Sequence, residues 1–371
     1  MISNKVIACI IGTRPEAIKL APVISELKRS HNFRSVVITT GQHRELLNKM
    51  LDRLEIVPDH HLDLMTEGQG LSDLVSRILP RLEEVFSKEN VDVVLGQGDT
   101  ATTFCAALTA FHKKIPFGHI EAGLRTNDLG NPFPEEGYRQ MISKISRWNF
   151  APTQSAADNL VLEGISLKRI HVTGNTGIDS LLLHAGKPNG QAVDGKRTIL
   201  LTAHRRENFG EPIKSIFRAV NRIVERFDDV EVVYPVHPNP NVSKLAMIML
   251  GKHPRIILKS PLDYFEFIDA MKQSTLILTD SGGIQEEAPA LGKPVLVMRE
   301  TTERPEAVQN GHALLVGVDE TAIFQAAEKL LVDSGLLSAM SRPGFPFGDG
   351  MAAGRIVEIL KNEWASCSAE S

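Results

Sequence analysis

Short apolar runs alternate with longer amphipathic segments along most of this 371-residue chain. The runs are typical of strands buried on both faces, and the spacing of apolar positions between them is typical of helices. Regular alternation of the two predicts a parallel α/β architecture. In the first half we expect strands at residues 6–11, 34–39, 91–95, 117–120, 148–151 and 170–173, and helices near residues 17–29, 45–54, 71–86, 100–112 and 136–143.

A polar, glycine-rich stretch at residues 186–197 interrupts this pattern and is the predicted linker. Strands resume at residues 198–202, 230–236, 256–258, 276–279, 294–298 and 313–316. We therefore expect two doubly wound Rossmann-like domains, residues 1–185 and 186–351, facing a central cleft at the carboxyl ends of their strands. A last helix is predicted at residues 355–362, and the segment 352–371 is a candidate to pack back on the first domain.

Composition narrows the class of protein. With 42% apolar and 23% charged residues the chain is an ordinary globular protein. A formal net charge of −4 argues against binding to a nucleic-acid backbone, and no apolar stretch is long enough to cross a membrane. Cys9, Cys105 and Cys367 are odd in number and widely spaced, so they predict neither a disulfide framework nor a zinc site and favour a cytoplasmic location.

The most informative segment is the turn after the strand expected at residues 276–279. Ser281, Gly282 and Gly283 lead into a helix expected at residues 284–291. A helix start of this kind leaves backbone N–H groups unpaired and partly positive, and glycines let a phosphate approach them. Glu287, one turn later, is placed to bind a ribose hydroxyl, and Arg304 to bind a phosphate oxygen. The segment is typical of a nucleotide diphosphate site, with an ordinary capped turn as the alternative.

Four acidic residues follow predicted strands or open a predicted helix in the first half. Asp99 follows the strand expected at residues 91–95, and Glu121 follows the strand expected at 117–120. Glu135 and Glu136 follow two prolines at the start of a helix; we assign Glu135 to the cleft and Glu136 to a structural role at the helix terminus. The alternative for Asp99 is simple helix capping.

Cationic residues and histidines follow other strands. Arg14 and Lys19 lie at the head of the first helix, where they are placed to meet a diphosphate. His204 stands beside two arginines, whose charge disfavours its protonation. His237 lies in a proline-rich loop and is as consistent with a structural role as with ligand contact.

Acids from several strand ends opposite a cationic diphosphate site favour chemistry at the anomeric carbon of a sugar nucleotide. The chain contains no HxxxH or cysteine–histidine metal set, no Walker lysine arrangement and no GxGxxG spacing. We therefore expect no metal and no nicotinamide cofactor.

A series of short motifs runs from residue 12 to about residue 307: GTRPEAIKLAPVI, TGQHR, QGDT, HIEAGLRT, PFPEE, GNTGID, HRREN, YPVHPNP, DSGGIQEEAP and GKPVLVMRETTERPEA. Each motif alone is weak, and the full series is specific. In its order and spacing the series resembles the non-hydrolysing UDP-N-acetylglucosamine 2-epimerases.

The resemblance implies a glycosyltransferase-B-like fold, a homodimer, and interconversion of UDP-N-acetylglucosamine and UDP-N-acetylmannosamine without a cofactor. By motif, it places Asp99, Glu121, Glu135 and His204 at catalytic or sugar-contacting positions. It assigns the diphosphate to Arg14, Lys19, Ser281, Gly282, Gly283 and Arg304, the ribose to Glu287, and uracil to the ring of Phe267 and the backbone of Leu262. In some members the region of Gln42 and His43 binds a second UDP-sugar as an allosteric activator.

One position departs from the family pattern, and because of it the resemblance does not fix the identity of the sugar substrate. The family commonly has Asn where this chain has Tyr138, next to the expected sugar pocket. Relatives acting on UDP-2,3-diacetamido uronic acids share the scaffold and are the nearest alternative. A hydrolysing epimerase, a retaining glycosyltransferase and a non-catalytic sugar-nucleotide sensor are further alternatives.

The hydrogen on C2 of such a sugar is not acidic, so direct removal by a carboxylate is too slow. The mechanism we expect is elimination of UDP to give a bound glycal, followed by re-addition. Asp99, Glu121 and Glu135 would share the proton transfers.

Overall fold

The computed structural model describes residues 4–41, 44–64, 68–186, 195–302 and 304–369. The chain forms two compact units. Unit 1 comprises Met1–Ser180 and Phe347–Ser371, and unit 2 comprises Leu181–Pro346. Most of the predicted linker, residues 187–194, lies outside the described residues.

Unit 1 is built on a parallel sheet of seven strands in the order β3-β2-β1-β4-β5-β6-β7. Its central strands β1 and β4 are mostly apolar and buried along most of their length, which is why their sequence shows no alternation of polar residues. The two-residue strand β3 at the sheet edge was not predicted from the sequence. The strands are β1 Lys5–Ile11, β2 Phe33–Thr39, β3 His60–His61, β4 Val93–Gln97, β5 Phe117–Ile120, β6 Trp148–Ala151 and β7 Ile170–Val172.

Amphipathic helices cover this sheet. In α3, for example, Leu74, Ile78, Leu82 and Val85 recur at spacings of three and four and are all buried. The helices of the first part of the chain are α1 Arg14–Arg29, α2 Arg44–Arg53, α3 Leu71–Lys88, α4 Ala101–His112, α5 Glu135–Ile145, α6 Gln154–Leu162 and α7 Thr176–Ala185, with a short 3₁₀ helix η1 at Leu167–Arg169.

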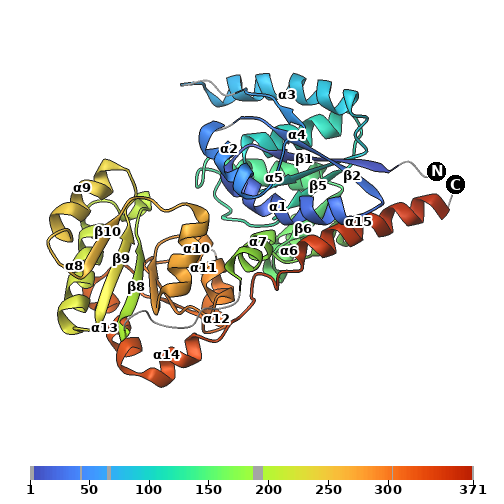
Figure 1. Cartoon of the computed structure of the whole chain (residues 1–371). Helices are drawn as coiled ribbons and strands as arrows, with labels where there is room; N and C mark the ends of the chain where they lie inside the picture. The colour runs from blue at the N-terminus through green and yellow to red at the C-terminus, as the bar shows by residue number, and fades with distance from the viewer. Residues whose placement is uncertain (1–3, 42–43, 65–67, 187–194, 303, 370–371) are drawn as a thin grey trace. The chain divides into compact units, whose positions relative to one another are not determined.

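The C-terminal helix α15, Ala352–Ala369, belongs to unit 1 and packs along α1 (Figure 1). Its first turn is capped by Asp179 of α7, whose carboxylate accepts hydrogen bonds from the backbone N–H of Ala352 at 3.2 Å and of Ala353 at 2.8 Å. Arg355 donates to the carbonyl of Thr173 at 3.0 Å. The last segment of the chain is therefore joined to the first unit by a cap, a side-chain bond and a helix–helix contact.

Unit 2 holds a second parallel sheet, of six strands in the order β10-β9-β8-β11-β12-β13. The strands are β8 Arg197–Thr202, β9 Val230–Pro235, β10 Ile256–Lys259, β11 Leu276–Thr279, β12 Val295–Val297 and β13 Ala313–Leu315. The helices are α8 Glu211–Arg226, α9 Pro240–Met249, α10 Tyr264–Gln273, α11 Gly282–Ala290, α12 Pro305–Gln309, α13 Glu320–Val332 and α14 Ser334–Met340, with a 3₁₀ turn η3 at Arg206–Asn208.

In both sheets the chain reverses its direction of winding beside the first strand of the unit. In unit 1 this switch point lies between β1 and β4, and in unit 2 between β8 and β11. Loops that leave the carboxyl ends of strands at such a point commonly form ligand sites. The predicted fold class, α/β with two doubly wound parallel sheets, is confirmed. In the described part of the chain, every helix is too short or too polar to span a membrane.

Candidate functional site

Unit 2 contains a cavity of about 350 Å³ at the carboxyl ends of its strands. Thr202, Pro235 and His237 contribute to its wall from the ends of β8 and β9. Six residues predicted from the sequence also line it: His204, Leu262, Phe267, Ser281, Gly283 and Glu287. The structure thus brings together, within one unit, most of the residues expected to hold a nucleotide.

Helix α11 begins at Gly282 with Ser281 as its N-cap, two residues before the expected start. The Ser281 side chain makes no capping hydrogen bond to the helix, and its backbone N–H donates instead to Thr279 Oγ1 at 2.9 Å. The partly positive N-terminus of α11 therefore lies at the wall of the cavity, next to Gly283. An anion is the ligand that this arrangement suits.

Gly282 allows the side chain of Arg304 to lie against the start of α11. A Cβ on Gly282 would be 2.8 Å from both Cζ and Nη1 of Arg304. Glu286, in the same helix, accepts a hydrogen bond from Arg304 Nε at 2.7 Å and so fixes the guanidinium there. The predicted phosphate ligands Gly282 and Arg304 are neighbours, and Glu286 is a supporting residue that the sequence analysis did not single out.

Phe267 and Leu262 are held by the start of helix α10. The N-cap Asp263 accepts hydrogen bonds from the backbone N–H of Phe265 at 2.9 Å and of Glu266 at 3.0 Å. This cap fixes the segment that carries Leu262 immediately before it and Phe267 one turn after it. Both residues line the cavity.

His204 stands at the end of β8, and the ring of His237 stacks on it with centroids 5.5 Å apart and planes 12° apart. Its Nδ1 lies 3.6 Å from Oδ1 of Asp280, a fully buried carboxylate at the end of β11. Burial lowers the pKa of His204, and His237 and Arg205 act in the same direction while Asp280 opposes them. His237, which the sequence left open, therefore contacts the predicted site residue and lines the same cavity.

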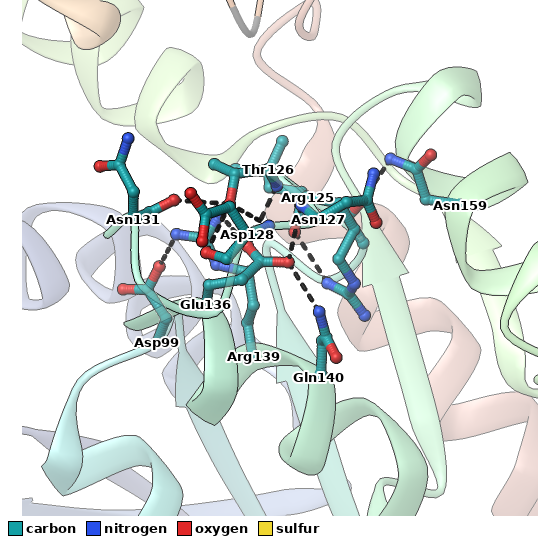
Figure 2. Close-up of polar contacts among 12 residues, drawn as sticks. Asp99, Arg125, Thr126, Asn127, Asp128, Asn131, Glu136, Arg139, Gln140 and Asn159 are labelled. Atoms are coloured by element: carbon teal, nitrogen blue, oxygen red, sulfur yellow. Dashed lines mark hydrogen bonds and ion pairs between the residues drawn. The ribbon is translucent and has the colours of Figure 1, made fainter. Parts of the chain in front are cut away.

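In unit 1, Asp99 lies in the loop after β4 and is paired with Arg139 of α5 (Figure 2). The backbone of this loop is held by His119, whose Nε2 donates to the carbonyl of Gly98 at 2.8 Å. Burial lowers the pKa of His119 to about 3, so it is a neutral donor at ordinary pH. Neither Arg139 nor His119 was expected as a partner, because no local pattern links positions 21 and 40 residues apart.

Glu136 of α5 is buried, and its carboxylate is hydrogen-bonded to the loop that precedes the helix. Its carboxylate accepts hydrogen bonds from the backbone N–H of Thr126 at 3.1 Å and of Asn127 at 3.2 Å, and from Gln140 Nε2 at 2.8 Å (Figure 2). These bonds and the charge of Arg139 outweigh burial and lower the pKa of Glu136. The contacts agree with the structural role expected for Glu136. Glu135 precedes it at the first position of α5 and is half-buried.

Glu121 directly follows β5 and is ion-paired with Lys19 of α1. Its backbone φ is 66°, in the left-handed region that non-glycine residues rarely adopt. Lys19, which the sequence analysis assigned to the diphosphate, is thus held beside a predicted catalytic acid in this structure. Arg14, its predicted companion, is exposed at the first position of α1.

Glu16 is a buried carboxylate that joins the loops after β1 and β4. It accepts hydrogen bonds from the backbone N–H of Gly12 and Thr13, both at 2.6 Å, and from the hydroxyls of Thr100 at 2.5 Å and Thr103 at 3.1 Å. Burial raises its pKa despite these bonds. The spacing of Thr13 and Glu16 is that of a capping box, which is the signal that could have identified this residue.

Two further expectations concern individual residues. Tyr138, the departure from the family pattern, is buried in the core of unit 1, where its ring stacks on Phe104 of α4 with centroids 4.8 Å apart. Gln42 and His43, the expected activator region, lie outside the described residues.

Comparison with known proteins gives a consistent result. Residues 25–361 match the family model described as UDP-N-acetylglucosamine 2-epimerase. The chain is 49% identical over 355 residues to UDP-N-acetylglucosamine 2-epimerase of Bacillus subtilis, covering 95% of this chain and 93% of that protein.

Solved structures of the same family are also similar to this chain. The UDP-GlcNAc 2-epimerase of Neisseria meningitidis, solved with UDP-GlcNAc bound, is 43% identical with a TM-score of 0.87, and the match covers 96% of this chain and 100% of that one. The Methanocaldococcus jannaschii enzyme, solved with UDP-GlcNAc and UDP, is 34% identical with a TM-score of 0.78, covering 96% and 99%. The chain belongs to the UDP-N-acetylglucosamine 2-epimerase family.

Proposed function

We propose that this chain interconverts UDP-N-acetylglucosamine and UDP-N-acetylmannosamine by inverting C2 of the sugar. The observation that carries the proposal is the cavity in unit 2, whose lining includes residues at a helix N-terminus, an aromatic ring and a carboxylate. Relatives covering nearly the whole chain are solved with UDP-GlcNAc or UDP bound. The cavity supplies what a uridine diphosphate needs: a surface for the base, an acceptor for the ribose and positive charge for the phosphates.

In this proposal the nucleotide is held by unit 2. The ring of Phe267 stacks on uracil, the backbone at Leu262 binds its edge, and Glu287 accepts from the ribose hydroxyls. The diphosphate is bound by the amides at Ser281, Gly282 and Gly283 and by Arg304, with Arg14 and Lys19 of unit 1 completing its neutralisation. The contact between Gly282 and Arg304 supports a shared role for these two residues.

The chemistry begins at C1, because the C2 hydrogen becomes acidic only when positive charge develops next to it. The bond from C1 to the diphosphate oxygen breaks, and fixed positive groups stabilise the leaving UDP. A carboxylate then takes the C2 proton and leaves a neutral glycal beside UDP. Return of a proton to the opposite face of C2, and of UDP to C1, completes the inversion. Asp99, Glu121 and Glu135 share the two proton transfers, with His204 near the diphosphate.

We further propose that the protein acts as a cytoplasmic homodimer that supplies an activated sugar for polysaccharide synthesis, and that a second UDP-sugar activates it near Gln42 and His43. The support is the family resemblance, together with free, buried thiols at Cys9 and Cys105, which fit a reducing compartment. The oligomeric state is accessible by light scattering, and activation by a sigmoidal dependence of rate on UDP-N-acetylglucosamine.

The function is tested by NMR of UDP-N-acetylglucosamine with purified protein in deuterated water. We expect UDP-N-acetylmannosamine to form with deuterium at C2, because the carboxylates exchange their protons with solvent. Hydrogen retained at C2 of the product excludes this route. Release of free N-acetylmannosamine indicates a hydrolysing epimerase instead, and turnover only of a UDP-2,3-diacetamido uronic acid assigns the alternative substrate. Binding without any turnover indicates a sensor.

A further inference from the structure

Asp280 makes contacts that the proposed mechanism does not use. It directly follows β11 and its side chain is fully buried. One oxygen, Oδ2, accepts three hydrogen bonds: from the backbone N–H of His204 at 2.8 Å and of Arg205 at 2.9 Å, and from Asn208 Nδ2 at 3.0 Å. The other oxygen, Oδ1, has no hydrogen-bond partner among the described residues and lies 3.6 Å from Nδ1 of His204. A buried carboxylate oxygen without a donor is costly, so this arrangement calls for an explanation.

Among the described residues whose charges shift the pKa of His204, Asp280 is the anionic one. His237 stacks on the imidazole from the end of β9, and Arg205 follows it in the chain. Beneath the loop, the buried Tyr234 donates its hydroxyl to the carbonyl of Ala203 at 2.7 Å and is neutral, since burial raises its pKa. Burial, His237 and Arg205 all disfavour a protonated His204, and Asp280 favours it. Asp280 therefore favours the protonated imidazole against burial and its two cationic or basic neighbours.

We propose that Asp280 is a positioning residue that keeps a proton on Nδ1 of His204 and so turns Nε2 toward the ligand in the cavity. The proposal rests on the proposed function, in which that ligand is a uridine diphosphate. The separation of 3.6 Å is just beyond hydrogen-bond length, so the proposal requires the ring to rotate slightly toward Asp280. A carboxylate in this relation to an imidazole fixes both its orientation and its tautomer.

The consequence for the reaction concerns the leaving group. When the dianionic diphosphate enters, its charge and that of Asp280 both favour the imidazolium, which takes its second proton from water. Nε2–H then donates a hydrogen bond to a phosphate oxygen, where negative charge grows as the C1–O bond breaks. His204 forms no covalent bond, and its extra proton returns to water when the ligand leaves.

The test is Asp280→Asn in the full-length protein, because Asn keeps the shape of the side chain. Its amide oxygen can still accept from the two backbone N–H groups and from Asn208. Its NH₂ group then faces Nδ1 of His204, which must become an acceptor, so that the neutral ring carries its proton on Nε2. With UDP bound, ¹⁵N NMR of histidine-labelled protein is expected to show both ring nitrogens of His204 protonated in the wild type, and a neutral ring protonated only on Nε2 in the variant.

Kinetics give a second readout. We expect kcat to fall by about 100-fold in Asp280→Asn, the usual contribution of a correctly protonated group, with a much smaller change in the Kd for UDP. The sign of the pH effect follows from the charge. Asp280 stabilises the imidazolium, so its loss lowers the pKa of His204, and the decline in rate on the alkaline side moves to lower pH.

The matched control is Asn208→Ala, which removes one of the three hydrogen bonds to Oδ2 and loosens the same loop without removing the charge. The protonation of its His204 ring and its pH profile are expected to match the wild type. If Asp280→Asn leaves the ring protonation and the pH profile unchanged, or if Asn208→Ala shifts them equally, Asp280 is only a loop anchor and the proposal fails. If Asp280→Asn does not fold, a neutral wild-type ring with its proton on Nε2 in the UDP complex overturns it. The NMR result is independent of turnover, so a failure of the proposed epimerase activity is recognised separately.

Discussion

At the scale of single residues, the carboxylates of the candidate site are held by specific partners in each unit. Asp99 is paired with Arg139, and Glu121 with Lys19. Asp280 is held by two backbone amides and an asparagine. Such contacts fix where each oxygen lies before a substrate arrives, which is the property that electrostatic catalysis requires.

Gly282→Ala tests whether the position of Arg304 matters for nucleotide binding. The new Cβ would lie 2.8 Å from the guanidinium carbon, so the Arg304 side chain must move away from the start of α11 and from Glu286. We expect the Kd for UDP to rise about tenfold, corresponding to about 1.4 kcal/mol. Because a flexible side chain can shift, and alanine favours a helix, the free energy of unfolding should change by less than about 1 kcal/mol. Calorimetric titration with UDP and a thermal melt measure the two quantities.

The control for this substitution is Gly354→Ala in α15, where an added Cβ meets no atom within 4 Å. Its affinity for UDP should equal that of the wild type. A Gly282→Ala protein that binds UDP as tightly as the wild type would show that Arg304 is not a phosphate ligand in this position.

At the scale of elements, the sequence predicts best where a buried run is bounded by polar residues. The strands at Phe117–Ile120, Trp148–Ala151 and Leu276–Thr279 match their expected bounds, because each is a fully buried, mostly apolar segment. Helix α1 begins three residues earlier than expected, at Arg14, since the capping box between Thr13 and Glu16 and the following proline start the helix before its apolar face begins.

The remaining differences come from interactions that local patterns do not contain. The edge strand β3 has only two residues, too few for a period to show. Asp280 stands in the most informative motif of the chain, yet its partner His204 is 76 residues away. Glu16 and Thr100 are 84 residues apart. The residues of the candidate site could be proposed from motifs, whereas the contacts that orient them follow from the register of the sheets.

Asp179→Ala tests how the C-terminal helix is held. The change removes the acceptor for two backbone N–H groups at the start of α15. Loss of a helix cap costs about 1 kcal/mol, and for a unit of this size the melting temperature should fall by about 2–4 °C. Hydrogen exchange at Ala352 and Ala353 should become faster in the same variant.

Glu358→Ala provides the comparison, because Glu358 lies on α15 with an exposed side chain 3.7 Å from Lys361. It should change the free energy of unfolding by no more than about 0.5 kcal/mol. Equal melting temperatures and equal exchange in the two variants would mean that packing along α1, and not the cap, secures the helix.

At the scale of the whole molecule, the predicted roles are divided between the two units. The acids Asp99, Glu121 and Glu135 are on unit 1, and the cavity lined by Ser281 and Glu287 is within unit 2. A protein built in this way can bind the nucleotide with one unit and perform chemistry with the other. Substitutions in the two units should therefore separate binding from turnover.

Asp99→Asn and Glu287→Gln form the pair that tests this division. Asp99→Asn retains the unit 2 cavity, so its Kd for UDP should equal the wild-type value, while kcat falls on the order of a hundredfold through the loss of a group that acts in the transition state. Glu287→Gln removes a charged acceptor for the ribose, and its Kd for UDP should rise about tenfold. Asp158→Asn, at an exposed position on α6, should change neither quantity.

If Asp99→Asn weakens UDP binding as much as Glu287→Gln does, the separation of roles fails, because then the acid of unit 1 contributes to the ground state as well as to the reaction.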